Sequence, residues 1–357
     1  MRLVLEKRNE KSKKMQILVP IFSLIISALL GAIVLLLTNA NPIKTYATII
    51  HGAFGSPTKI QYTLVKMLPL LMCGLSVGIA FRLKFWNIGA EGQYVMGVIG
   101  ITWVMQFWTW LPPILVLPIA LIMSFAFGGL WGGIPGALKA HWKVDETLVT
   151  LMMNYIAIGI AEYLYINAWK APKGNMGTVK YPEYAWIGKM WGKVHYGIFI
   201  ALILVAVLYF LLYKTRWGFE LNMIGKNSEA ARCQGVSIKR NIILAMILSG
   251  GIAGLGGGIN SAAVTHCLTK GVDSGYGFTG ILIAWMSNLN PILSIFISLF
   301  LAALQTGSDA LQITMKLPSS MSEVLQGLIL LPLLAGNIFI DHRLRIVEKK
   351  STEALEE

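Results

Sequence analysis

The stretch MQILVPIFSLIISALLGAIVLLLT, from Met15 to Thr38, decides the class of fold. It contains no charged side chain. A helix rises about 1.5 Å per residue, so about 20 apolar residues are enough to cross the ~30 Å hydrocarbon core of a membrane. The stretch is too long for the apolar region of a signal peptide, and no small-x-small cleavage site follows it. It therefore predicts an uncleaved first membrane span.

Similar apolar blocks recur along the 357-residue chain, of which 55% is apolar and only 13% charged. A soluble globular domain carries about a quarter charged residues, so this composition excludes one. We expect an all-α polytopic membrane protein with about ten transmembrane segments, at residues 17–38, 62–81, 94–110, 113–138, 147–168, 196–213, 241–263, 277–289, 291–311 and 323–340. The segments 94–110 and 277–289 are weak, because polar residues precede the first and the second is short. Such segments are often broken helices that line a cavity.

The distribution of basic residues predicts how the chain crosses the membrane. The net charge is +13, and 20 of the 30 Lys and Arg residues fall in alternate gaps, beginning with the N-terminal one. The other gaps hold 9, five of them in the aromatic loop 169–195, which we expect at the outer interface. This bias places both termini in the cytoplasm. It predicts a basic N-terminus (1–16), a transmembrane domain (17–340) with an inner loop (214–240), and a cytoplasmic tail (341–357), and it explains the charge without nucleic acid.

An internal repeat appears when the chain is shifted by 178 residues. LPPILVLPIALIMSFAFGG (111–129) then lies on LNPILSIFISLFLAALQTG (289–307), with Pro113 on Pro291 and Gly129 on Gly307. Since the offset is five spans, an odd number, the two copies must have opposite orientations, as in the inverted repeats of transporters. The alternative is a match by composition alone, because identities among Leu, Ile and Ala are common in apolar segments.

Catalytic and metal-binding patterns are not found in the sequence. The three cysteines and five histidines are widely separated, and there is no H-E-x-x-H, no G-x-S-x-G and no P-loop. The Gly-rich run Ser249 to Gly258 lies inside an apolar span, which favours close helix packing over phosphate binding. We expect no enzyme activity, no metal site and no cofactor bound by this chain.

Polar residues inside the apolar segments are the better functional candidates, because charge in a bilayer is costly and is kept for a partner or a cavity. Asn87, Gly89, Glu91 and Gln93 precede or open the weak third span, and Asn154 lies in the middle of the fifth. Glu91 is either the cap of a helix start, with Arg82 or Lys84 as a surface partner, or part of a translocation gate. Asn154 is also compatible with an ordinary bond between helices.

The inner loop 214–240 contains GKNSEAARCQGVSIKR, which predicts a short helix around Ser228 to Gln234 with a cap at Asn227 or Ser228. Small residues at Ala230, Ala231 and Gly235 would allow close approach by a partner. The alternative is a solvated connecting loop.

Several motifs resemble those of binding-protein-dependent ABC importer permeases. Glu229-Ala-Ala231, followed after three residues by Gly235, is similar to their EAA-x3-G coupling motif, without its apolar tail. The segments FWNIGAEGQ (85–93), VDETLVTLMMNYIA (144–157), LSGGIAGLGGG (248–258) and GYGFTGILIAWMSNLNP (275–291) resemble the simple-sugar and nucleoside branch of the ribose and branched-chain amino acid permease superfamily. The chain looks most like the first permease of bacterial nucleoside uptake systems. Two departures are Trp86 before Asn87, and SNLNP in place of the usual LLG-x-x-P.

The resemblance implies a multi-pass permease of the bacterial plasma membrane that carries a small polar solute by alternating access. The partners it implies are a second homologous permease, an extracellular substrate-binding lipoprotein and a cytoplasmic ATPase that holds ATP and magnesium. It implies two sets of site residues. Those for coupling to the ATPase are Asn227, Ser228, Glu229, Ala230, Ala231, Arg232 and Gly235, and those for the pathway or gate are Asn87, Gly89, Glu91, Gln93, Asn154, Phe278 and Asn288.

The cargo implied is a nucleoside, with a simple sugar such as ribose or galactose as the alternative. An ion-coupled secondary transporter is less favoured because Lys66, Asn154 and Glu162 do not form a relay along one path. A lipid-modifying enzyme is also less favoured, because it would need clustered acidic or His residues at a membrane interface, which the sequence lacks.

Overall fold

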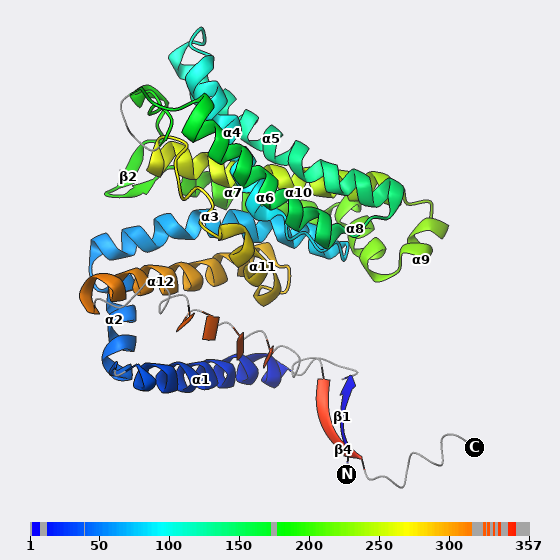
Figure 1. Cartoon of the computed structure of the whole chain (residues 1–357). Coiled ribbons are helices and arrows are strands. Elements are labelled where there is room, and N and C mark those ends of the chain that lie inside the picture. The colour runs from blue at the N-terminus through cyan, green and yellow to red at the C-terminus, as the bar shows by residue number, and fades with distance from the viewer. Residues whose placement is uncertain are drawn as a thin grey trace. The chain divides into compact units, whose positions relative to one another are not determined.

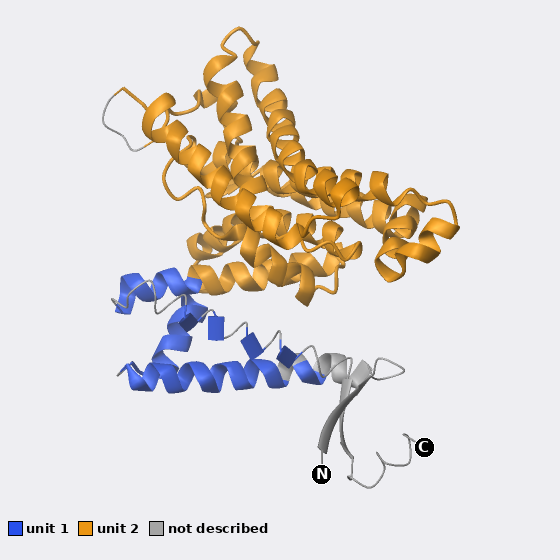
Figure 2. Cartoon of the chain, turned by 45° about the vertical axis from the view of Figure 1, so that its right-hand side comes forward, with its two compact units in different colours: residues 1–52, 307–357 blue, residues 53–306 orange. Residues whose placement is uncertain are grey.

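The computed structural model describes residues 2–7, 13–38, 40–172, 177–315 and 342–347, and the pairs 324–325, 327–328, 331–332 and 335–336. The chain forms two compact units, residues 1–52 with 307–357, and residues 53–306 (Figure 2). The site described below lies entirely in the second unit.

The described elements are mostly helical (Figure 1). The α-helices are α1 (Lys13–Leu37), α2 (Pro42–Phe54), α3 (Pro57–Arg82), α4 (Ala90–Phe107), α5 (Pro113–Trp142), α6 (Glu146–Tyr163), α7 (Gly197–Lys214), α8 (Arg216–Lys226), α9 (Ser228–Cys233), α10 (Ile238–Asn260), α11 (Tyr276–Met286) and α12 (Pro291–Met315). Two π-helical turns, η1 (Leu164–Ala168) and η3 (Ser261–Thr265), extend α6 and α10, and η2 (Glu183–Ala185) is a 3₁₀ turn. Strand β1 (Arg2–Lys7) pairs antiparallel with β4 (His342–Val347), and β2 (Lys189–Trp191) pairs with β3 (Val194–His195).

Six of the described helices are long and apolar enough to cross a membrane, or seven if the bent pair of α1 and α2 forms one span. This confirms a helical polytopic membrane protein, although fewer spans meet the length and hydropathy criteria than the ten expected. The two weak segments account for part of the difference. Helix α4 does not meet the criteria, and the eleven residues of α11 extend only about 16 Å. The expected span 323–340 lies largely outside the described residues.

The core of the second unit is built on glycines where α5 crosses α10. A methyl group added at Gly128 of α5 would lie 2.4 Å from the carbonyl oxygen of Gly250 and 2.7 Å from the Cα of Gly254, both in α10. These backbones approach closely because neither helix has a side chain at the contact. The packing interpretation of the Gly-rich run is therefore confirmed.

Helices α3 and α10, which the predicted repeat aligns, run in opposite directions. The offset of 178 places α3, α4 and α5 on α10, α11 and α12, and α5 and α12 both begin at the aligned prolines. Arg82, the last residue of α3, donates to Asn222 of α8, whereas Asn241, near the start of α10, donates to Glu220 of α8. The carboxyl end of α3 and the amino end of α10 therefore lie at the same end of the unit, as an inverted repeat requires.

The described parts of the loop 169–195, residues 169–172 and 177–195, lie at the opposite end of the second unit from α8 and α9. Figure 1 shows β2 and α9 at these two ends. The Tyr181 hydroxyl lies 2.7 Å from that of Thr102 and 2.8 Å from that of Ser261, and the Trp186 ring stacks on His266 at 3.8 Å. Residues 181–186 of the loop thus pack on η3 and on α4.

Candidate functional site

A buried polar cluster lies where α3, α4 and α10 meet. The side-chain amides of Asn87 and Gln93 donate to each other, at 3.1 and 3.2 Å. Asn87 also donates to the Ser249 hydroxyl, which donates to the carbonyl of Ser76. All four side chains are at most 1% exposed. In this conformation Asn87 and Gln93 hold helices together and do not line an open channel.

Asn154, half-way along α6, fixes the segment that leads into α4. Its carbonyl accepts the Gly92 N–H at 2.8 Å, and its amide donates to the Ile88 carbonyl at 2.9 Å. The added Cβ at Gly89 would lie 3.0 Å from Thr150, and the added Cβ at Gly92 would lie 2.9 Å from Asn154. Both glycines therefore leave room for the close passage of α6.

Glu91 joins the starts of two helices. It lies in the first turn of α4, and its carboxylate accepts the backbone N–H of Gly275 at 2.8 Å and that of Gly277 at 2.5 Å, which open α11. It is 1% exposed. The amino end of a helix carries about half a positive charge, so the two helix starts together offset one buried carboxylate. The carboxylate therefore holds the short helix α11 against α4.

The prediction that Glu91 pairs with Arg82 or Lys84 at the surface is wrong. Arg82 is 8% exposed, and its guanidinium donates to the Leu289 carbonyl and to Asn222. Glu91 is a cap, but of the helix α11, whose N-cap residue Gly275 lies 184 residues later in the chain. Spacing along one helix cannot predict such a contact.

The remaining two pathway candidates lie on the other side of α11 or beyond it. Phe278 is 42% exposed on α11. Asn288 is exposed in the turn that follows, with φ of 50°. On the same helix, Trp285 is 43% exposed and lies 5.7 Å from the ring of Trp86. The structure thus divides the predicted pathway residues into a buried group and two exposed residues, Phe278 and Asn288.

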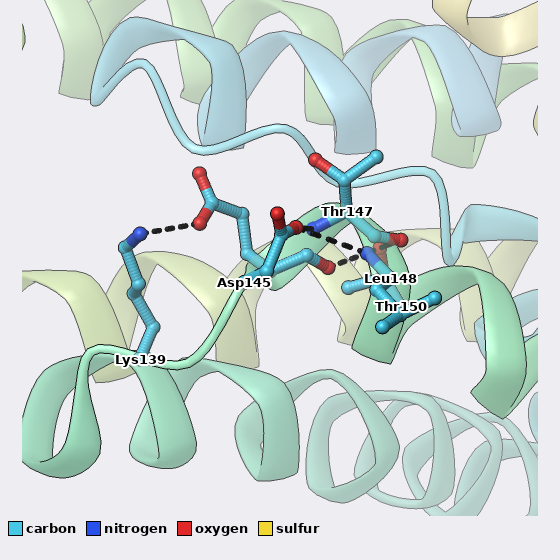
Figure 3. Close-up of polar contacts among 6 residues, drawn as sticks. Lys139, Asp145, Thr147, Leu148 and Thr150 are labelled. Atoms are coloured by element: carbon cyan, nitrogen blue, oxygen red, sulfur yellow. Dashed lines mark hydrogen bonds and ion pairs between the residues drawn. The ribbon is translucent and has the colours of Figure 1, made fainter.

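The loop between α5 and α6 is fixed by polar contacts (Figure 3). The Asp145 carboxylate accepts the N–H groups of Thr147 and Leu148, at 2.9 and 3.1 Å, and so caps α6. Lys139 pairs with Glu146 at 2.5 Å. The Thr150 hydroxyl, one turn on, accepts the N–H of Ile88 at 3.2 Å. The cap therefore supports the segment next to the buried cluster.

Asp145 gives a pH-dependent prediction. The backbone N–H groups of Leu148 and Thr147 lower the pKa of the Asp145 carboxyl. Because the folded pKa lies below the unfolded value, the stabilisation is complete above the unfolded pKa and is lost as pH falls through the folded pKa. We expect Asp145→Ala to lower the unfolding temperature by a few degrees at pH 7, with a smaller difference in acid. Asp145→Asn, which keeps a capping oxygen, should lose little at pH 7; an equal loss for both variants would contradict the cap.

Comparison with known proteins decides the family. Residues 59–334 match the family model described as branched-chain amino acid transport system / permease component. The chain belongs to this family. It is 32% identical to a guanosine ABC transporter permease of Bacillus subtilis (strain 168), over 88% of this chain and 92% of that one. It is 30% identical to a nucleoside ABC transporter permease of Lactococcus lactis, over 85% and 86% of the chains. A glucose ABC transporter permease of Haloferax volcanii is 28% identical, over 92% and 89%.

In this permease the predicted helix 228–234 is present as α9. Asn227 is its cap, since its side chain accepts the N–H groups of Glu229 and Ala230. Gly235 ends it with φ of +77°, and the N–H of Val236 reaches back to the Ala231 carbonyl. This is a Schellman ending, which favours glycine at that position. Gly235 therefore follows the two alanines at the position where the backbone that ends α9 has a positive φ.

The side chains of α9 show which of the coupling candidates are accessible. Ala231 is buried, whereas the other six, Asn227, Ser228, Glu229, Ala230, Arg232 and Gly235, are exposed. The coupling role of this surface remains a prediction.

Glu91→Gln tests the contact between the Glu91 carboxylate and the start of α11, which we call the Glu91 bridge. An amide has one carbonyl oxygen, so one of the two N–H groups of α11 loses its acceptor and faces an NH₂ group. We expect uptake to fall about tenfold or more, with normal assembly. The control is Glu162→Gln on the exposed side of α6, which should retain uptake. If Glu91→Gln transports normally, the bridge has no role in translocation.

Proposed function

We propose that this chain is the translocating subunit of an ATP-driven importer that carries nucleosides across the bacterial plasma membrane. Family membership supports the permease role, and the two nucleoside permeases at 30% identity or more support the cargo. The observation that carries the mechanism is the Glu91 bridge. It closes the junction of two helices that begin inside the apolar bundle, as discontinuous helices do in transporters.

Features of the chain support the partners that we propose. The sequence has no P-loop, so ATP and magnesium would be held by a cytoplasmic ATPase that contacts the exposed surface of α9. A second homologous permease would complete the pathway, and an extracellular lipoprotein would deliver the cargo. The charge bias supports a cytoplasmic position for α8 and α9 and for both termini. The loops 169–195 and 264–276 would then face outward.

Transport would alternate access by movement of α11. ATP-driven closure of the ATPases would pass through α9 to α8, whose Asn222 is bonded to Arg82 of α3. Arg82 also holds the Leu289 carbonyl just after α11. A shift at α9 is thereby linked to both ends of α11, since Glu91 holds the other one. Rigid elements joined in this way transmit a movement without a change of fold.

A simple sugar is the second candidate cargo, because the glucose permease relative is almost as similar as the nucleoside ones. The two are separated by measuring uptake of radiolabelled guanosine, adenosine and glucose in cells that express the complete importer. We expect unlabelled nucleosides to compete for guanosine uptake and glucose to have no effect. Uptake of glucose that nucleosides do not inhibit would replace the nucleoside proposal by the sugar one.

A further inference from the structure

A pocket of about 220 Å³ opens at the end of the second unit covered by the loop 264–276, just above the Glu91 bridge. It lies between α3, α4, η3, the loop and the first residue of α11. We propose that this pocket is the entry site of the permease and binds the planar base of an uncharged nucleoside. This inference rests on the proposed nucleoside transport and assigns to it a place. The volume lies below the ~300 to 1,000 Å³ of sites for drug-sized ligands, so it suits part or all of one small solute.

The aromatic rings favour a planar ligand. Tyr94 and Tyr276 meet edge to face at 5.8 Å between ring centres on one side of the pocket. Tyr62, 46% exposed, lines it from α3. Tyrosine rings bind flat heteroaromatic groups through their faces and keep a polar tip for hydrogen bonding. A base offers these rings a flat π-face that a hexose lacks, which favours a nucleoside over a sugar.

The polar groups favour a ligand rich in hydrogen-bond acceptors. Among the described residues that line the pocket there is no carboxylate, whereas Lys66 and Lys270 both line it. A cationic solute would therefore be disfavoured, and the carbonyl and ring nitrogens of a nucleobase would be favoured. Lys66 also lies within the apolar helix α3, where an ionisable side chain points to a functional role.

The pocket wall includes an irregular turn that places an amide beside the tyrosines. Asn260 is the last residue of α10 before the π-helical turn η3, and its amide donates to the Tyr94 hydroxyl at 2.9 Å. π-helical turns inside helices often occur at functional sites. The Asn260 amide carries both a donor and an acceptor, which suits the hydrogen-bonding edge of a base.

The floor of the pocket is the junction that has to open. Tyr276 directly follows Gly275, whose N–H is held by Glu91, and Tyr94 is in the next turn of α4 after Glu91. A base seated in the pocket against these two rings would contact both helices of the bridge. Release of α11 from Glu91 would separate Tyr276 from Tyr94 and open a way from the pocket toward the other end of the bundle.

A native thiol in the pocket allows ligand binding there to be measured. Cys267 lines the pocket and is partly exposed, whereas Cys73 is buried and Cys233 lies on α9 at the opposite end. Right-side-out vesicles containing the complete importer are treated with a membrane-impermeant methanethiosulfonate reagent, and the modification rate at each cysteine is read by mass spectrometry. Cys267 should react from outside, and Cys233 only after the membrane is permeabilised.

Guanosine should slow modification of Cys267 about tenfold once it fills roughly nine-tenths of the sites, whereas the same concentration of glucose should not. Tyr276→Leu should abolish the protection while Cys267 still reacts at its unliganded rate, which shows that the pocket is folded. The matched control, Tyr184→Leu in the exposed turn η2, should keep the protection.

Guanosine uptake in the same vesicles separates the two proposals. Uptake without protection of Cys267, or equal protection by glucose, would overturn the pocket assignment and leave nucleoside transport standing. Absence of guanosine uptake together with uptake of glucose would overturn the proposed function. Failure of Cys267 to react from outside would also overturn the entry site.

Discussion

Gly128→Ala should prevent α5 and α10 from packing, with a loss of about 3 kcal/mol or more in folding stability. The added methyl group would lie 2.4 Å from the Gly250 carbonyl oxygen and 2.7 Å from the Gly254 Cα. Both contacts are with backbone, which cannot rotate away as a side chain does. The helices would have to separate, and the contacts on both sides of the crossing would be lost. The measurement is the thermal unfolding of the purified permease, with gel filtration to detect aggregation.

The same substitution at another buried glycine is the control. Among the residues that the structure describes, none has an atom within 4 Å of a methyl group added at Gly78 in α3. Alanine favours helix over glycine by about 1 kcal/mol, so Gly78→Ala should leave stability unchanged or raise it. Equal destabilisation by the two variants would mean that the α5–α10 contact is not specially close.

Ala230→Arg should abolish uptake and binding of the ATPase while the permease still inserts and folds. Ala230 is exposed on α9, and arginine is nearly as good a helix former as alanine, so the helix should persist. A long charged side chain at the centre of a docking surface would keep the ATPase from close contact. Uptake, co-purification of the ATPase and thermal unfolding of the permease are measured together.

Ala230 is a sharper test of coupling than Gly235. Any side chain at Gly235 would have to adopt φ near +77°, so Gly235→Arg would strain the end of α9 as well as block docking. His141→Arg, on an exposed residue at the end of α5, is the control for an added cation at the same end of the bundle. Normal uptake by Ala230→Arg would remove α9 from the coupling surface.

The sequence predicts the helices well where a property is local. The apolar blocks at 62–81, 113–138 and 291–311 all lie within observed helices, because an apolar run of this length is stable in a bilayer as a helix. The cap at Asn227 could be predicted because an N-cap depends on the next three residues. Helix α2 was missed because its segment, PIKTYATIIHGAF, is short and contains polar residues that dilute the apolar signal.

The candidate site was predicted in its members but not in its contacts. Asn87, Glu91, Gln93 and Asn154 stood out because polar groups inside apolar segments are costly. Their partners did not: Ser76 and Ser249 look like ordinary small residues, yet they complete the cluster around Asn87. The pocket below the loop 264–276 was also missed, since Tyr94, Asn260 and Tyr276 come from three separate segments. The exception is Lys66, a cation in an apolar helix, which was a signal for that pocket.

The most direct test of the account is guanosine uptake into proteoliposomes that contain this chain, its partner permease, the ATPase and the binding lipoprotein. The account predicts uptake that requires ATP and persists when proton and sodium gradients are abolished, and no uptake by this chain alone under either gradient. Accumulation of guanosine by this chain alone, driven by an ion gradient without ATP, would contradict the account.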